Sequence, residues 1–133
     1  MRQQVAFIIE DDEALRELFT EALQQAGFET EALDDGDVAM TRLAASKPDV
    51  IVLDLNLPHV SGQQILQHIR ASTQLENTRV IVVSANHRLA ESLRILADLV
   101  LIKPVSFSQL RDLAKRMYLS IEETLLDNPS TVR

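Results

Sequence analysis

Five residues with reactive side chains each stand at the end of a short apolar run: Glu10, Asp11, Asp54, Ser84 and Lys103. The runs that precede them are rich in Val, Ile and Leu and cover residues 5–9, 50–53, 79–83 and 99–102. Runs of this length and composition are typical of strands buried on both faces of a parallel sheet. Because the carboxyl ends of parallel strands lie at one edge of the sheet, we expect the five side chains to converge there.

This set of side chains predicts phosphoryl chemistry that uses a divalent cation. Neighbouring carboxylates repel one another unless a cation lies between them, and Mg²⁺ is commonly held by one or two carboxylates. We therefore expect Glu10 and Asp11 to help hold Mg²⁺. With that charge neutralised, Asp54, which closes the central run, can attack a phosphoryl group and form an aspartyl phosphate. Lys103 and Ser84 can each hold one phosphoryl oxygen.

Two of the acidic residues have a second explanation. Taken alone, Asp54 could cap the turn that follows its strand instead of facing a ligand crevice, and only the convergence of the other strand ends favours the crevice. Asp12 could belong to the acidic set or cap the helix that begins at Glu13. We assign Asp12 to the cap.

Helical segments separate the apolar runs. Apolar residues recur at helical spacing in residues 13–26, 38–45, the segment after Gly62, residues 88–96, and a last segment that begins at Ser106 or Ser108 and ends at Asn128-Pro129. An alternating run at residues 28–33 predicts one further strand, at a sheet edge. Five strands therefore alternate with five helices, which predicts a doubly wound α/β fold with a parallel sheet.

The last two helices differ in their expected packing. The fourth has a thin apolar stripe, so we expect it to be mobile. In the last helix, Phe107, Ala114 and Ile121 recur every seven residues, and Leu125 continues the apolar stripe. We expect no core beneath the final turns, and the apolar area exposed there makes a homodimer through this helix plausible.

Composition limits the classes of protein to which the chain can belong. With 133 residues, of which 46% are hydrophobic, one domain is expected, over residues 1–127, with residues 128–133 as a tail or the start of a linker. The chain has no Cys and no apolar run long enough to span a membrane, and it lacks a signal-peptide pattern, so a cytoplasmic location is expected. A net charge of −7 argues against direct binding of nucleic acid or of an anionic membrane.

Several motifs together resemble those of one family. They are the acidic set Glu10-Asp11-Asp12, the segment P-D-V-I-V-L-D-L-N-L-P followed by Gly62, the pair Ser84-Ala85 and the pair Lys103-Pro104. In this combination the chain resembles a response-regulator receiver domain of two-component signal transduction systems, from about residue 5 to about residue 121. We therefore expect a flavodoxin-like fold with strand order 2-1-3-4-5.

The resemblance also assigns roles to single residues. It implies that Asp54 is the phosphoacceptor, and that Mg²⁺ is held by Glu10, Asp11, Asp54 and the backbone carbonyl of Asn56. Ser84 matches the switch hydroxyl and Lys103 the phosphate-contacting lysine. The implied donor is a phosphohistidine on a partner sensor histidine kinase or phosphotransfer protein. The implied role is signalling, with self-catalysed phosphorylation and dephosphorylation, and not that of an enzyme.

Two positions depart from the family pattern and keep a rival reading open. Val100 stands where the family usually has a Tyr or Phe switch residue, and Val105 where a Phe is common. A receiver-like module that only docks a partner without taking phosphate is therefore an alternative. A metal-dependent phosphohydrolase is a second rival, but it would need an acidic residue at the position of Asn56.

The remaining polar residues are expected to have structural or solvent-exposed positions. We place Asp49 in the turn at Pro48 and Arg70 on the outer face of its helix. The three histidines have no companion at metal-ligand spacing and are expected on the surface: His59, His68 and His87.

Overall fold

The structure of the protein, a computed structural model, describes residues 2–127. The strands are β1 (Val5–Ile9), β2 (Glu29–Leu33), β3 (Val50–Asp54), β4 (Arg79–Ser84) and β5 (Leu99–Ile102). The helices are α1 (Glu13–Ala26), α2 (Gly36–Ala44), α3 (Gly62–Ala71), α4 (His87–Ser92) and α5 (Phe107–Asp127), with short 3₁₀ helices η1 (Thr73–Leu75) and η2 (Arg94–Leu96). All strand pairs are parallel and the sheet order is β2-β1-β3-β4-β5. The predicted flavodoxin-like fold is confirmed.

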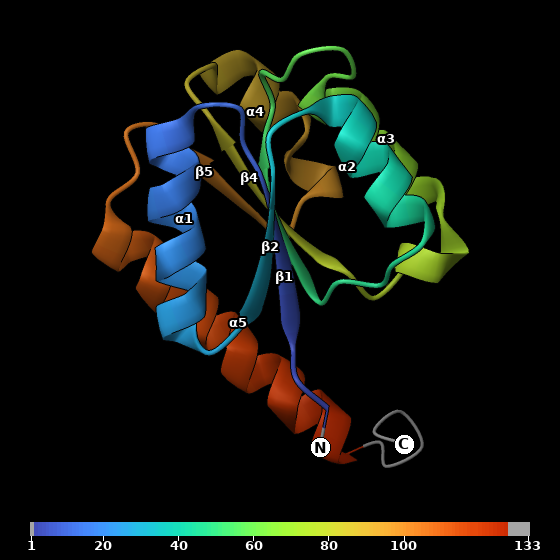
Figure 1. Ribbon diagram of the computed structural model, residues 1–133, viewed down its shortest axis with the longest axis vertical. Coiled ribbons are helices and arrows are strands. Elements are labelled where there is room, and N and C mark those ends of the chain that lie inside the picture. The colour runs from blue at the N-terminus through green and yellow to red at the C-terminus, as the bar shows by residue number, and fades with distance from the viewer. Residues whose placement is uncertain (1, 128–133) are drawn as a thin grey trace.

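The sheet is covered on both faces, as the continuous apolar strands require (Figure 1). Because side chains alternate along a strand, Ile8 and Val52 enter one core, which α1 and α5 cover. Phe7 and Ile51 enter the other, which α2 and α3 cover. All five residues of β3 are buried, so the carboxyl end of this strand is held at a fixed position in the middle of the sheet.

Helix α1 begins and ends where its sequence signals place it. The Asp12 side chain accepts a hydrogen bond of 2.9 Å from the backbone N–H of Leu15, which confirms its assignment as the N-cap. Gly27 follows the helix with φ of 118°, a conformation that favours glycine. Next to it, Phe28 and Tyr118 pack edge to face with ring centroids 5.3 Å apart, which joins the end of α1 to α5.

The fourth helix is shorter than predicted. A single helix over residues 88–96 was expected, but α4 has six residues and is followed by the separate 3₁₀ helix η2. Ala90 is buried but offers little apolar area, and Ile95 is 91% exposed. Leu93 is 4% exposed and packs in the core that α2 and α3 cover, but it is the C-cap of α4, so the predicted apolar stripe does not lie on one continuous helix.

Arg70 has a structural role that its place on an amphipathic helix does not reveal. Its guanidinium donates hydrogen bonds to the carbonyls of Leu96 (2.6 Å) and Thr78 (2.9 Å) and to the carboxylate of Asp98 (2.8 Å). The same carboxylate oxygen of Asp98 accepts from the N–H of Val80. The expected solvent-facing position of Arg70 is therefore wrong, because its partners come from distant parts of the chain.

Asp49 also has more partners than a turn residue needs. Its carboxylate forms two hydrogen bonds with Arg2, at 2.7 and 2.9 Å, and accepts from the N–H of Val5 at 2.8 Å. Asp49 therefore fixes the start of β1 beside β3, a role that its place in the Pro48 turn does not reveal.

The last helix is long, as expected, and Ser106 caps it by accepting from the N–H of Gln109 at 3.0 Å. A core does lie beneath its final turns, contrary to expectation, because Leu125 is 8% exposed and belongs to the α1–α5 core. The buried Gln4 side chain, just before β1, donates to the Tyr118 carbonyl at 3.0 Å and helps hold this end of the helix. Leu126 is 59% exposed.

The predicted homodimer through α5 stays a prediction. The predicted end of the helix at Asn128-Pro129 and the tail at residues 128–133 lie outside the described residues. Within residues 2–127, no helix is both long and apolar enough to cross a membrane.

We predict that Leu125→Ala lowers the free energy of unfolding by roughly 2 kcal/mol, because it removes buried apolar volume. The neighbouring change Leu126→Ala alters the same side chain in an exposed position and should change this free energy by less than about 0.5 kcal/mol. Urea denaturation followed by circular dichroism measures both. Equal effects of the two changes would show that the core does not reach the end of α5.

Candidate functional site

The carboxyl edge of the sheet brings four of the five sequence-predicted side chains into one cluster. Glu10 and Asp11 follow β1 and Asp54 ends β3, and one carboxylate oxygen from each lies within 4.8 Å of the others. Lys103, after β5, places its Nζ 3.1 Å from Glu10 Oε1 and 3.4 Å from Asp54 Oδ1. Glu10 and Asp54 are 1% and 3% exposed, whereas Asp11 is exposed.

Ser84 lies at the same edge but outside this cluster. Its Oγ accepts a hydrogen bond of 3.0 Å from the backbone N–H of Asn86, which is the N-cap of α4. The hydroxyl is therefore tied to its own loop. Asn56 lies beside Asp54, since its backbone N–H donates to Asp54 Oδ1 at 3.3 Å.

Gly62 allows the loop after β3 to fold tightly against the site. A Cβ atom at this position would overlap the backbone carbonyl oxygen of Asp54 and the backbone of Leu55. The N–H of Gly62 also donates to the carbonyl of Leu55 at 3.2 Å. The start of α3 thus packs directly on the end of β3, which explains why the motif has glycine eight residues after Asp54.

Burial dominates the electrostatics of Glu10. Loss of solvation, together with the hydrogen bond and repulsion from Asp54, raises the pKa of Glu10 to about 7, although Lys103 and the N–H of Asp12 oppose the shift. Burial acts to lower the pKa of Lys103, but its close contact with Glu10 and the charge of Asp54 outweigh burial, so that this pKa is raised. Lys103 therefore stays charged at neutral pH.

The donor set fits a small divalent cation. Glu10 Oε1 is buried and, within residues 2–127, accepts no hydrogen bond of suitable geometry, although it forms an ion pair with Lys103 Nζ at 3.1 Å. A buried carboxylate oxygen without a donor is costly, and a hard cation beside it would remove that cost. Three carboxylates with oxygen atoms this close are the ligands that Mg²⁺ prefers.

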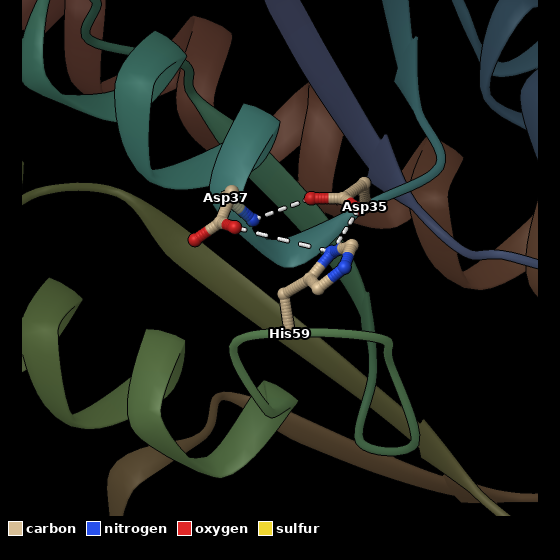
Figure 2. Close-up of side chains that lie close together, drawn as sticks. All are labelled: Asp35, Asp37 and His59. Atoms are coloured by element: carbon tan, nitrogen blue, oxygen red, sulfur yellow. Dashed lines mark hydrogen bonds and ion pairs between the residues drawn. The ribbon is translucent and has the colours of Figure 1, made fainter.

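A second cluster of charged side chains, which the sequence reasoning missed, surrounds His59 (Figure 2). His59 Nδ1 lies 2.6 Å from Asp35 Oδ2 and 3.9 Å from Asp37 Oδ2, and the hydrogen bond to Asp35 raises the pKa of His59. His59 has no companion at metal-ligand spacing along the chain, but the fold brings Asp35, 24 positions away, against it. His59 itself is 64% exposed, and His68 and His87 are exposed as predicted.

Arg16, near the start of α1, also belongs to this edge of the sheet. Arg16 Nη1 donates to the backbone carbonyls of Glu10 (3.1 Å) and Asp11 (3.2 Å). An arginine shortly after an acidic strand end was the available signal, but helical periodicity alone assigns such a residue to solvent.

Comparisons with known proteins agree with this fold. The family model described as the response regulator receiver domain matches residues 6–115, so the chain belongs to the receiver-domain family, whose members are signalling domains of two-component systems. The chain is similar to the phosphate regulon transcriptional regulatory protein PhoB of Rhizobium meliloti, with 34% identity over 113 residues. The match covers 83% of this chain and 50% of that protein, so the chain spans about half the length of this relative.

Solved structures show the same architecture. A CheY-like response regulator receiver domain from Methylobacillus flagellatus has 28% identity and a TM-score of 0.76, with coverage of 87% of this chain and 99% of that one. The response regulator TrrA from Thermotoga maritima, solved in complex with Mg(2+)-BeF, has 24% identity and a TM-score of 0.76, with coverage of 86% and 99%. The second likeness shows the fold alone.

We predict that Glu10 makes the protein less stable as pH rises from about 5 to about 7. Its pKa is about 7 in the folded chain and near 4.5 in the unfolded chain, so the folded state binds more protons in this window. The free energy of unfolding therefore falls with rising pH, by no more than about 1.4 kcal/mol per unit from this group.

Urea denaturation at pH 5, 6, 7 and 8 with a chelator present tests this. Glu10→Gln cannot ionise, so its free energy of unfolding should not show the fall with pH that Glu10 causes. The variant should therefore be more stable than wild type at pH 8. If the free energy of unfolding changed with pH in the same way in both proteins, the prediction would be contradicted.

Proposed function

We propose that the protein is a phosphorylation-driven switch in which Asp54 accepts a phosphoryl group from a phosphohistidine on a partner histidine kinase or phosphotransfer protein. The carrying observation is the nearly buried Asp54 carboxylate at the end of the central strand, in contact with Lys103 and beside Glu10 and Asp11. Membership of the receiver-domain family supports the same chemistry.

The chain's own residues account for the transfer. An Asp54 carboxylate oxygen forms a bond to phosphorus while the phosphorus–nitrogen bond of the donor breaks, and the electron pair of that bond returns to the imidazole. Lys103, already within 3.4 Å of Asp54 Oδ1, would hold one phosphoryl oxygen. Because Glu10 and Asp54 are both nearly buried, little water surrounds the reacting carboxylate.

The metal site of the proposal consists of Glu10, Asp11, Asp54 and the backbone carbonyl of Asn56. The orphaned Oε1 of Glu10 supports this assignment. When bound, Mg²⁺ would neutralise the carboxylates and polarise the phosphoryl oxygens.

Ser84 links the phosphoryl group to α4. A phosphoryl group adds three strong acceptor oxygens, which would compete with the Asn86 carbonyl for the hydrogen bond that the Ser84 hydroxyl now donates at 3.5 Å. Because Asn86 caps α4, moving Ser84 disturbs the start of this short helix. Val100 is half-buried against the second core, and its stiff β-branched side chain cannot report the change by a large rotation. We therefore assign transmission to the loop and α4.

A docking module that takes no phosphate is the alternative, and Val100 at the usual aromatic position favours it. The buried cluster around Asp54 argues against it, since buried carboxylates without a chemical role are costly to keep. The phosphohydrolase rival is weaker, because the Asn56 amide cannot serve as a general acid or base.

We predict that incubation with Mg²⁺ and acetyl phosphate adds the mass of one phosphoryl group, and that Asp54→Asn abolishes this addition because the nucleophile is lost. Intact-mass spectrometry measures it. Asp34→Asn, an exposed carboxylate outside the cluster, is the matched control and should label like wild type. Labelling of the Asp54→Asn protein would move the site elsewhere, and no labelling of wild type would favour the docking module.

We further predict that a beryllofluoride phosphate mimic changes hydrogen exchange in residues 85–96 far more than in α2 or α3. The segment has few buried side chains that hold it in one conformation. A small free-energy change at Ser84 should therefore shift its conformations more than those of α2 or α3. Hydrogen–deuterium exchange with peptide mass spectrometry provides the comparison, and Ser84→Ala should reduce the change. Unchanged exchange in residues 85–96, with the mimic bound, would rule out this route.

A further inference from the structure

Arg16 makes an unusual pair of contacts at the acidic edge. A single nitrogen, Nη1, donates to two consecutive backbone carbonyls, those of Glu10 and Asp11. Four acidic residues, 10–13, surround this part of the chain, yet the hydrogen bonds that the described residues show for the Arg16 side chain as donor go to the backbone. The guanidinium therefore stabilises a backbone shape and does not itself occupy the carboxylates of Glu10 and Asp11.

This backbone shape allows two neighbouring residues, Glu10 and Asp11, to direct their carboxylates to the same site. In an extended strand, consecutive carbonyls and consecutive side chains point in opposite directions. At the end of β1, both carbonyls face one nitrogen, so the chain departs from the extended form there. The same departure lets the Glu10 and Asp11 carboxylates approach each other and Asp54 within 4.8 Å. Holding both carbonyls holds the directions in which both side chains leave the backbone.

We propose that Arg16 is a positioning residue for the divalent-cation site, acting through the Glu10 and Asp11 carbonyls. The proposal rests on the proposed function, because the cation site belongs to it. The helix supports the arrangement, since the Arg16 N–H also donates to the Asp12 carbonyl at 2.8 Å. Arg16 is thus fixed to all three residues of the turn from β1 into α1.

Charge alone gives the opposite expectation. A guanidinium near a cation site repels the cation, so a simple electrostatic effect would make removal of Arg16 strengthen Mg²⁺ binding. If Arg16 instead positions the ligands, its removal should weaken Mg²⁺ binding, because groups that orient metal ligands typically contribute tenfold or more to affinity. The sign of the change therefore separates the two explanations.

The test is calorimetric titration of Mg²⁺ into wild type, Arg16→Gln and Arg16→Lys. We expect about tenfold weaker binding for Arg16→Gln. Arg16→Lys keeps the charge but loses the planar donor, and should bind with intermediate affinity. Arg116→Gln, which removes an exposed arginine beside the opposite ends of β4 and β5, is the matched control and should bind like wild type.

Two further measurements separate positioning from a general structural role. The thermal midpoint in chelator should change little in Arg16→Gln, while the Mg²⁺ concentration for half-maximal labelling by acetyl phosphate rises and the maximal labelling stays the same. Unchanged or tighter Mg²⁺ binding in both Arg16 variants would overturn the proposal, as would a lower midpoint with unchanged affinity. If wild type binds no Mg²⁺, both this proposal and the cation site fail, whereas labelling at Asp54 tests the phosphoacceptor separately.

Discussion

Two nearly buried carboxylates held beside one lysine are the constraint on which the rest of the structure depends. Glu10 and Asp54 lie where an unpaired charge is costly, and Lys103 offsets part of that cost through contacts of 3.1 and 3.4 Å. Such an arrangement persists only if the surrounding chain cannot relax. The two-sided core supplies this rigidity, because the strands that carry the three residues are packed between helices on both faces.

Most of the fold could be predicted because its signals are local. The apolar strands, the Asp12 cap and the glycine after α1 each follow from a few neighbouring residues, and strand–helix alternation then defines the sheet. The failure at α4 has a physical reason. Periodicity marks where a helix can form, but not whether it is continuous, and the buried Leu93 stands at the break between α4 and η2.

The candidate site could be predicted as a set of residues but not as a set of contacts. Parallel topology brought Glu10, Asp54 and Lys103 together as expected, because all follow strands. The contacts of Arg16, Arg70 and His59 do not follow from helical periodicity, since each partner is a backbone carbonyl or a side chain on a different loop. A residue that acts by holding other groups in place cannot be recognised from the spacing of residues in the sequence.

The packing of Tyr118 has a practical consequence for spectroscopy. The chain has one Tyr and no Trp, and this Tyr lies against Phe28 and Gly27, at the amino-terminal end of the sheet, away from Asp54. Its ring stands at 86° to that of Phe28 in the layer that joins α1 to α5. The intrinsic fluorescence of the protein is therefore a reporter of global unfolding and of α1–α5 contact, and it is silent about events at the opposite edge of the sheet.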